Sequence, residues 1–175
     1  MALEGACWIK FEGSIGAITG DSVKDKRKGA LDIIEFSHDF VSPRDPATGQ
    51  ATGKRAHKPA CMTFVYQNCI PQLYDALARN ESAKEVKIEF YSNNALGKHG
   101  GVGTEALHYR ITLKDAFISR LQHVMLNTRV LAQTERADNK FVEHHIKSEW
   151  VYGEITWEWL INGNKMANDN WKIVR

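Results

Sequence analysis

The chain has 175 residues, of which 43% are hydrophobic, and a formal net charge of +2 from 23 basic and 21 acidic side chains. This length and apolar content predict one domain, residues 1–175, with a real core. The balanced charge gives no electrostatic reason to expect nucleic acid or an anionic membrane as the main partner, and no run approaches the ~20 apolar residues of a membrane span.

The first half of the chain predicts two strands and a long loop. Cys7, Ile9 and Phe11 have the period-two alternation of a half-buried strand, and residues 31–38 predict a second one. Between them, residues 25–28 are all charged, which predicts a solvated loop. Residues 41–59 contain three of the four prolines and no apolar periodicity, so we expect a long loop there. Loops of this length usually have a function.

Residues 69–79 are the one segment that predicts an α-helix. Its apolar side chains have the spacing of a single helical face, which we expect to be buried: Ile70, Leu73, Tyr74 and Leu77. Asn80 can adopt the left-handed conformation that ends a helix. A helix of roughly eleven residues is not stable alone in water, so it must pack against a sheet.

The remaining elements are predicted as strands. Residues 61–66 precede the helix, and residues 85–91 and 107–113 alternate as antiparallel neighbours. A strand over 116–125 follows, and the last long strand is interrupted by a β-bulge near Trp150, where the apolar phase shifts. Residues 162–175 are left as a short tail. Six or seven strands with one helix predict a mainly β fold, an antiparallel β-barrel or sandwich.

Two motifs resemble chemical sites but lack the required context. Residues 101–106 match G-x-G-x-x-A, but a dinucleotide site needs a helix after the glycines, and a strand is predicted there. His144 and His145 are adjacent on a predicted strand, so they point to opposite faces and cannot easily share a metal ion. We therefore expect no cofactor and no metal site.

The three cysteines cannot all pair within one chain, so we expect reduced thiols and folding in the cytoplasm. A cysteine nucleophile at Cys61 or Cys69, with His57 or His108 as its base, stays open because such groups need not be close in sequence. Buried structural thiols are the commoner outcome. Cys69, at a helix N-terminus, is expected to have a lowered pKa.

The loop over 41–59 ends in a locally basic sequence, TGKRAHKP. Surfaces that bind nucleic acid interleave aromatic residues with basic ones, and this loop has no Phe, Trp or Tyr. A protein partner is therefore the preferred interpretation for its basic side chains and the residues beside them: Lys54, Arg55, His57, Lys58 and Pro59.

In combination, these segments resemble the haemolysin-coregulated protein (Hcp) family of the bacterial type VI secretion system. The resemblance rests on the order and spacing of short motifs along most of the chain: Ile9-x-Phe11-Glu12-Gly13, Thr52-Gly53-Lys54-Arg55, His57-Lys58-Pro59, Pro71-x-Leu73-Tyr74-x-Ala76-Leu77, Leu113-Lys114-Asp115-Ala116 and Val151-Tyr152 with Ile155 and Trp157. Residues 93–104 and 127–139 depart from the pattern.

The resemblance implies a β-barrel with one flanking helix that assembles into hexameric rings, which stack into the inner tube of a contractile injection apparatus. It also implies a non-enzymatic protein that meets sheath, spike and effector proteins, carries effectors in the ring lumen and is expelled from the cytoplasm. No signal peptide is visible in MALEGACWIK. The long loop would reach a neighbouring subunit through Lys54, Arg55, His57, Lys58 and Pro59. The alternative function is a small cysteine-dependent hydrolase or a ligand-binding β-barrel.

Overall fold

The computed structural model describes residues 5–93, 105–127, 144–161 and 164–170. In these parts of the chain the structure is mainly β with one α-helix, as predicted. The strands are β1 (Gly5–Phe11), β2 (Ala17–Ile18), β3 (Leu31–Ser37), β4 (Phe40–Val41), β5 (Ala56–His57), β6 (Ala60–Val65), β7 (Ala83–Asn93), β8 (Glu105–Met125), β9 (His144–Val151), β10 (Glu154–Trp159) and β11 (Lys165–Asn170). The helix is α1 (Ile70–Ala78), and a short 3-10 turn, η1, spans Asp25–Arg27.

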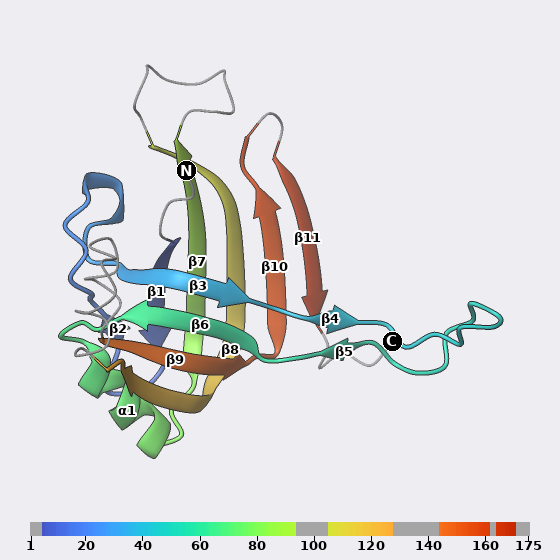
Figure 1. Ribbon diagram of the computed structural model, residues 1–175, viewed down its shortest axis with the longest axis horizontal. Helices are drawn as coiled ribbons and strands as arrows, with labels where there is room; N and C mark the ends of the chain where they lie inside the picture. Colours follow the sequence, from blue (N-terminus) through green and yellow to red (C-terminus); the bar gives the residue numbers. More distant parts are fainter. Residues whose placement is uncertain (1–4, 94–104, 128–143, 162–163, 171–175) are drawn as a thin grey trace.

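Antiparallel pairing closes the sheet on itself in the order β8, β7, β1, β3, β6, β9 and back to β8 (Figure 1). The strand β10 pairs with β8 outside this closed sheet, and β11 pairs with β10. The predicted neighbours over 85–91 and 107–113 are confirmed, since Val86 lies opposite Leu113 and Ile88 opposite Ile111. The architecture is therefore a barrel-like antiparallel sheet with a two-stranded extension.

The strand β8 is long enough to belong to both parts of the sheet. Its first half pairs with β10 and its second half with β9. Asp115, at the midpoint, has a φ of 48°, and the register against β9 shifts between Ile118 and Arg120. Residues 116–125 are therefore strand, as predicted, but they continue the strand over 107–113 through Asp115 and do not form a separate one.

The apolar side chains predicted by alternation fill the closed sheet. The core is formed by side chains of the closed sheet, of β10 and of α1, and its largest fully buried apolar members are Ile9, Leu31, Met62, Phe64, Ile70, Leu73, Ile88, Leu113, Ile146, Trp150 and Ile155. Burial of apolar area is the main stabilising contribution to such a fold. The sheet and the helix thus stabilise each other.

The helix α1 buries a slightly different face from the predicted one. Ile70, Leu73 and Ala76 are buried, whereas Tyr74 is 39% exposed and Leu77 only partly buried against the core. The prediction that Tyr74 is buried is wrong, because the small side chain of Ala76 is the one turned to the sheet. Asn80, just after the helix, has the expected positive φ, 53°.

Two predictions for the C-terminal part are corrected. The predicted last long strand is two strands, because β9 ends at Val151 and β10 begins at Glu154 on a different half of β8; the register shift near Trp150 lies in β8, between Ile118 and Arg120. The segment 162–175 is not simply a tail, because β11 pairs with β10 along its whole length. The sequence KMANDN of β11 has no apolar alternation, so only its backbone pairing identifies it as a strand.

The charged segment over 25–28 is solvated as predicted at Asp25, Lys26 and Lys28, but not at Arg27. Arg27 in η1 has a completely buried side chain whose Nη2 donates to both carboxylate oxygens of Glu105, at 2.7 Å each. Its guanidinium carbon lies 4.8 Å from the ring centroid of Tyr91. Tyr91 in turn donates to Glu89, which pairs with Arg110. A salt bridge and a cation–π contact therefore hold this segment on β7 and β8.

Within the described part of the chain, α1 is too short to span a membrane, and no other helix is long and apolar enough to do so.

Candidate subunit interface

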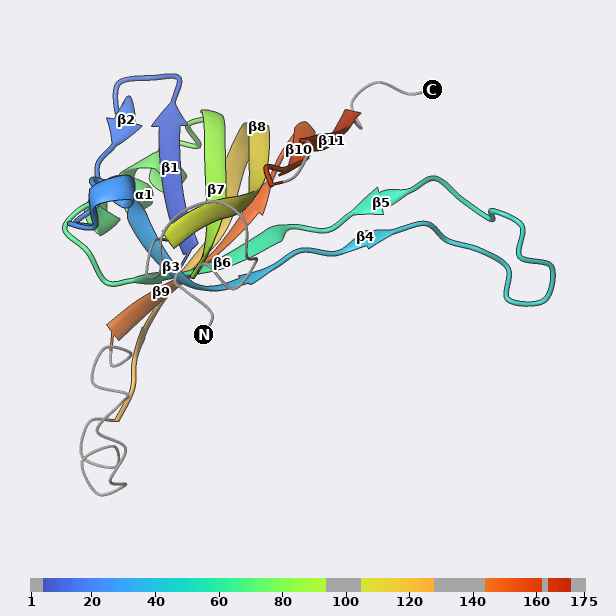
Figure 2. The same ribbon diagram turned by 90° about the horizontal axis from the view of Figure 1, so that it is seen from above.

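The predicted loop over 41–59 is an extended hairpin, called the arm below and defined as residues 40–58. Its base is the paired strands β4 and β5, and Arg44 bridges to Ala51 further out. Near the tip, the carboxylate of Asp45 accepts hydrogen bonds from the Ala47 N–H at 2.9 Å and the Thr48 hydroxyl at 2.8 Å. Figure 2 shows the arm projecting well beyond the closed sheet.

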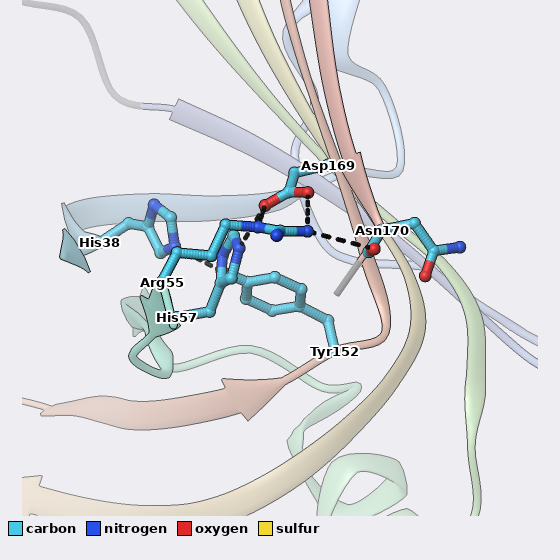
Figure 3. A network of polar contacts seen from close by, with 6 residues as sticks. All are labelled: His38, Arg55, His57, Tyr152, Asp169 and Asn170. Atoms are coloured by element: carbon cyan, nitrogen blue, oxygen red, sulfur yellow. Dashed lines mark hydrogen bonds and ion pairs between the residues drawn. The ribbon is translucent and has the colours of Figure 1, made fainter. Parts of the chain in front are cut away.

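The arm is held at its base by a carboxylate from the distant strand β11. Asp169 accepts two hydrogen bonds from the Arg55 guanidinium, both at 2.6 Å, and lies 2.8 Å from Nε2 of His57 (Figure 3). The Arg55 hydrogen bond is the main reason that the pKa of Asp169 is lowered, and His57 adds to the effect. Bidentate contacts of this kind fix orientation as well as distance.

A hydrogen-bonded chain continues from His57 into the body of the protein. The Tyr152 hydroxyl, in the turn between β9 and β10, lies 2.9 Å from Nδ1 of His57 and 2.5 Å from Nε2 of His38. The ring of Phe40 stacks on His57 with centroids 4.4 Å apart. Three segments that are distant in sequence therefore meet at the arm base. The six side chains that make these contacts are called the anchor below: His38, Phe40, Arg55, His57, Tyr152 and Asp169.

The number of protons available to the hydrogen bonds among His38, Tyr152 and His57 shows why these bonds depend on pH. One hydroxyl proton serves two contacts to Tyr152, so one of the two facing imidazole nitrogens must donate and the other must accept. A protonated His38 can no longer accept the Tyr152 hydroxyl proton, and its added charge lies beside the His57 ring, whose centroid is 6.3 Å away.

Acid pH is therefore expected to weaken the anchor through His38. Burial, and then the charge of His57, lower the pKa of His38 below its usual 6.5. The folded state therefore binds this proton less readily than the unfolded state. The stability that neutral His38 contributes is complete above pH 6.5 and is lost as the pH falls through the lower folded-state pKa. Denaturant unfolding at pH 7.5 and at pH 5.5 should show that the free energy of unfolding falls more on acidification for the wild type than for His38→Gln.

We expect the wild type and His38→Gln to differ by less than about 1 kcal/mol in this loss of unfolding free energy, because His38 is only half-buried and water screens its neighbours. His123→Gln, which changes an exposed imidazole outside the anchor, should keep the wild-type pH dependence. An unchanged dependence in His38→Gln would exclude His38 as the titrating group.

The predicted interface residues fall into two groups. Arg55 and His57 belong to the anchor, and the His57 side chain is 2% exposed. Lys54 and Lys58 are exposed, and Lys58 has only a long ion pair, 3.5 Å, with the equally exposed Asp39. Pro59 lies half-buried at the start of β6. The partners Tyr152 and Asp169 were missed, because no local pattern links them to the arm.

The cysteine-nucleophile hypothesis finds no supporting contact among the described residues. Cys7 and Cys69 are buried. Burial raises the pKa of Cys7 far above its usual value and that of Cys69 to about 11, so the prediction of a lowered pKa at Cys69 is wrong: desolvation outweighs the helix N-terminus. The half-buried Cys61 donates only to the Pro59 carbonyl, and His57 faces Tyr152 and Asp169 instead.

The other sequence motifs are resolved in part. His144 is exposed and His145 buried, as expected for adjacent positions on a strand. Residues 101–104 of the glycine motif lie outside the described residues, and the strand β8 begins directly after them. The stretch over 127–139 lies outside the described residues as well, apart from its first position.

Comparison with known proteins identifies the family. The family model described as "Type VI secretion system effector, Hcp" matches residues 8–159, which include the arm, the helix and all of the closed sheet except the first three residues of β1. The chain belongs to the Hcp family. The resemblance stated from short sequence motifs is therefore confirmed.

Individual Hcp proteins agree with this assignment. The "Major exported protein" of Pseudomonas aeruginosa is 30% identical over 161 residues, which cover 90% of this chain and 86% of the relative. Among solved structures, a doubly substituted Hcp1 from E. coli EAEC 042 has a TM-score of 0.77 at 23% identity, covering 97% of this chain and 99% of its own. Hcp3 from P. aeruginosa has a TM-score of 0.71 at 23% identity, covering 98% and 99%. These structures share the Hcp fold.

Proposed function

We propose that this chain is a structural subunit of the inner tube of a type VI secretion system. In this proposal it forms homohexameric rings that stack, meets the sheath and spike proteins, and is exported from the cytoplasm with effector proteins in the ring lumen. Membership of the Hcp family over residues 8–159 is the observation that carries the proposal. The name of the P. aeruginosa relative, an exported protein, agrees with the export step.

The arm supplies a surface suited to such an assembly. A closed ring needs a heterologous interface, in which one patch meets a different patch of the next subunit. A hairpin that projects beyond the sheet and is tied down at its base presents its outer residues in a defined place without ordering them on contact. Lys54 lies beyond the anchor and is exposed, so its charge is available to a neighbour.

We infer that the five predicted interface residues have different roles in subunit assembly. Lys54 and Lys58 meet acidic residues of an adjacent subunit, where exposed charges steer and register the contact more than they strengthen it. Arg55 and His57 act from within the chain by holding the arm against Asp169. Pro59 joins the arm to β6 without a backbone donor that would need a partner.

The double variant Lys54→Glu/Lys58→Glu is the test. Wild type should elute several-fold above one chain in light-scattering gel filtration and form rings and tubes in electron micrographs. The variant should keep the wild-type circular dichroism but assemble less, most clearly at low salt, where charge is least screened.

Lys28→Glu/Lys84→Glu is the matched control, because it makes the same charge change at exposed lysines away from the arm. Equal loss in both variants would show a general effect of net charge. Normal assembly of the arm variant would place the interface elsewhere, and a wild type that stays monomeric at all concentrations would contradict the ring proposal itself.

A further inference from the structure

A second cluster of aromatic and sulfur-containing side chains lies at the opposite end of β9 from the anchor. Met125 at the end of β8 is directly opposite His144 at the start of β9, and His123 is two residues before Met125. Positions opposite each other in an antiparallel pair, or two apart on one strand, share a face. His123, Met125 and His144 therefore project from the same face of the same two strands.

Ring contacts confirm this placement for the two histidines. The centroids of the His123 and His144 rings are 5.8 Å apart, and both rings pack against Tyr66, at 5.1 and 5.8 Å. His123 and His144 are exposed, and Met125 is 63% exposed. The two imidazoles are thus held beside each other at the surface, and Met125 lies next to them on the same face outside the buried core.

The spacing suits a shared metal ion. Two imidazoles that bind one ion through nitrogens at ~2.0–2.1 Å have ring centroids about 5–6 Å apart. Among the described residues, no three His, Cys, Asp or Glu side chains form a metal-binding group. The third donor here is of another kind, the thioether of Met125. Tyr66 stacks on His123 and limits its rotation, as the surroundings of metal ligands commonly do.

The donor types select the metal. Imidazole suits zinc, nickel and copper, whereas a thioether favours the soft ion Cu(I) and adds little to the binding of harder ions. We propose that His123, His144 and Met125 form a surface site for monovalent copper. This site is separate from the arm and does not depend on the proposed tube function.

Competition with a chromogenic Cu(I) chelator, bicinchoninate, under anaerobic reducing conditions tests the proposal. The full chain is used in a Cys61→Ser background, because a half-buried thiol would also bind Cu(I). This protein should withdraw one equivalent of copper per chain. His123→Ala and His144→Ala should each weaken binding at least about tenfold. Met125→Leu should weaken Cu(I) binding by a similar factor while leaving Zn(II) binding nearly unchanged.

His108→Ala, which removes a histidine elsewhere on β8, is the control and should bind copper like the parent protein. The side chains of His123, His144 and Met125 are exposed, His108 is half-buried, and circular dichroism checks that each variant is folded. The proposal is overturned if the parent protein leaves the copper with the chelator, if either histidine variant binds as tightly as the parent, or if the control loses as much affinity. Equal effects of Met125→Leu on Cu(I) and Zn(II) would remove the thioether from the site and with it the preference for copper.

Discussion

Glu105→Ala should lower the free energy of unfolding by about 3 kcal/mol. The Arg27 side chain is completely buried and donates to both oxygens of this carboxylate at 2.7 Å. Removing the carboxylate breaks a salt bridge to a buried cation, and loss of one partner of a buried pair commonly destabilises a protein by about 3–5 kcal/mol. The lower end of that range applies because the Glu105 side chain is 31% exposed, so water replaces part of the interaction. Equilibrium denaturation at fixed protein concentration measures the loss.

Two further variants separate the charge effect from ordinary loss of contact. Glu158→Ala removes the outer partner of Arg110, a 3.5 Å ion pair whose two side chains are both 27% exposed, and should change stability by less than about 1 kcal/mol. Arg27→Met/Glu105→Ala removes both charges and should be less destabilised than Glu105→Ala alone. A double variant at least as unstable as Glu105→Ala would show that packing, not the unpaired charge, dominates.

Leu73→Ala is expected to destabilise the protein by about 2–5 kcal/mol. Leu73 is 0% exposed at the centre of the contact between α1 and the closed sheet. The truncation removes apolar contact area and leaves a cavity, because the close-packed surroundings relax only partly. Denaturant unfolding monitored by tryptophan fluorescence provides the measurement.

The helix face offers its own control series. Leu77→Ala should cost less than Leu73→Ala, since Leu77 is only partly buried, and Tyr74→Ala should cost least because its ring is 39% exposed. The reverse order would mean that the helix packs through the face that the sequence pattern predicts. A loss below ~1 kcal/mol at Leu73 would contradict the idea that α1 is a main part of the core.

The local alternation of apolar and polar residues was sufficient to predict most of the strands. Period-two alternation around Ile9, Ile88 and Ile111 predicts half-buried strands, and each lies buried in the closed sheet. Alternation fails where a strand has no buried face: no residue of β11 is buried, and its pairing with β10 is visible only in the backbone. It also fails to show whether two strands are joined, which is why β8 was divided at Asp115.

Only part of the candidate interface can be predicted from the sequence, for a related reason. The basic residues of the arm stand out because they are consecutive, and Lys54 and Lys58 are exposed as expected. Nothing local marks Asp169 as their neighbour, since 114 positions separate it from Arg55. The division of the basic residues into inner and outer groups therefore needed the coordinates.

By itself the sequence determined a mainly β chain with one helix near residue 70, a long segment over 41–59 and membership of a recognisable family, because these depend on residue types at fixed local spacing. Only the tertiary structure decided which charges are buried. Arg27 and Glu105 are 78 residues apart, yet their contact buries Arg27 within a segment whose other charged residues are exposed. Whether a charge meets water or a partner depends on how distant strands pair, and hydrogen-bonded register between strands is not encoded in either strand alone.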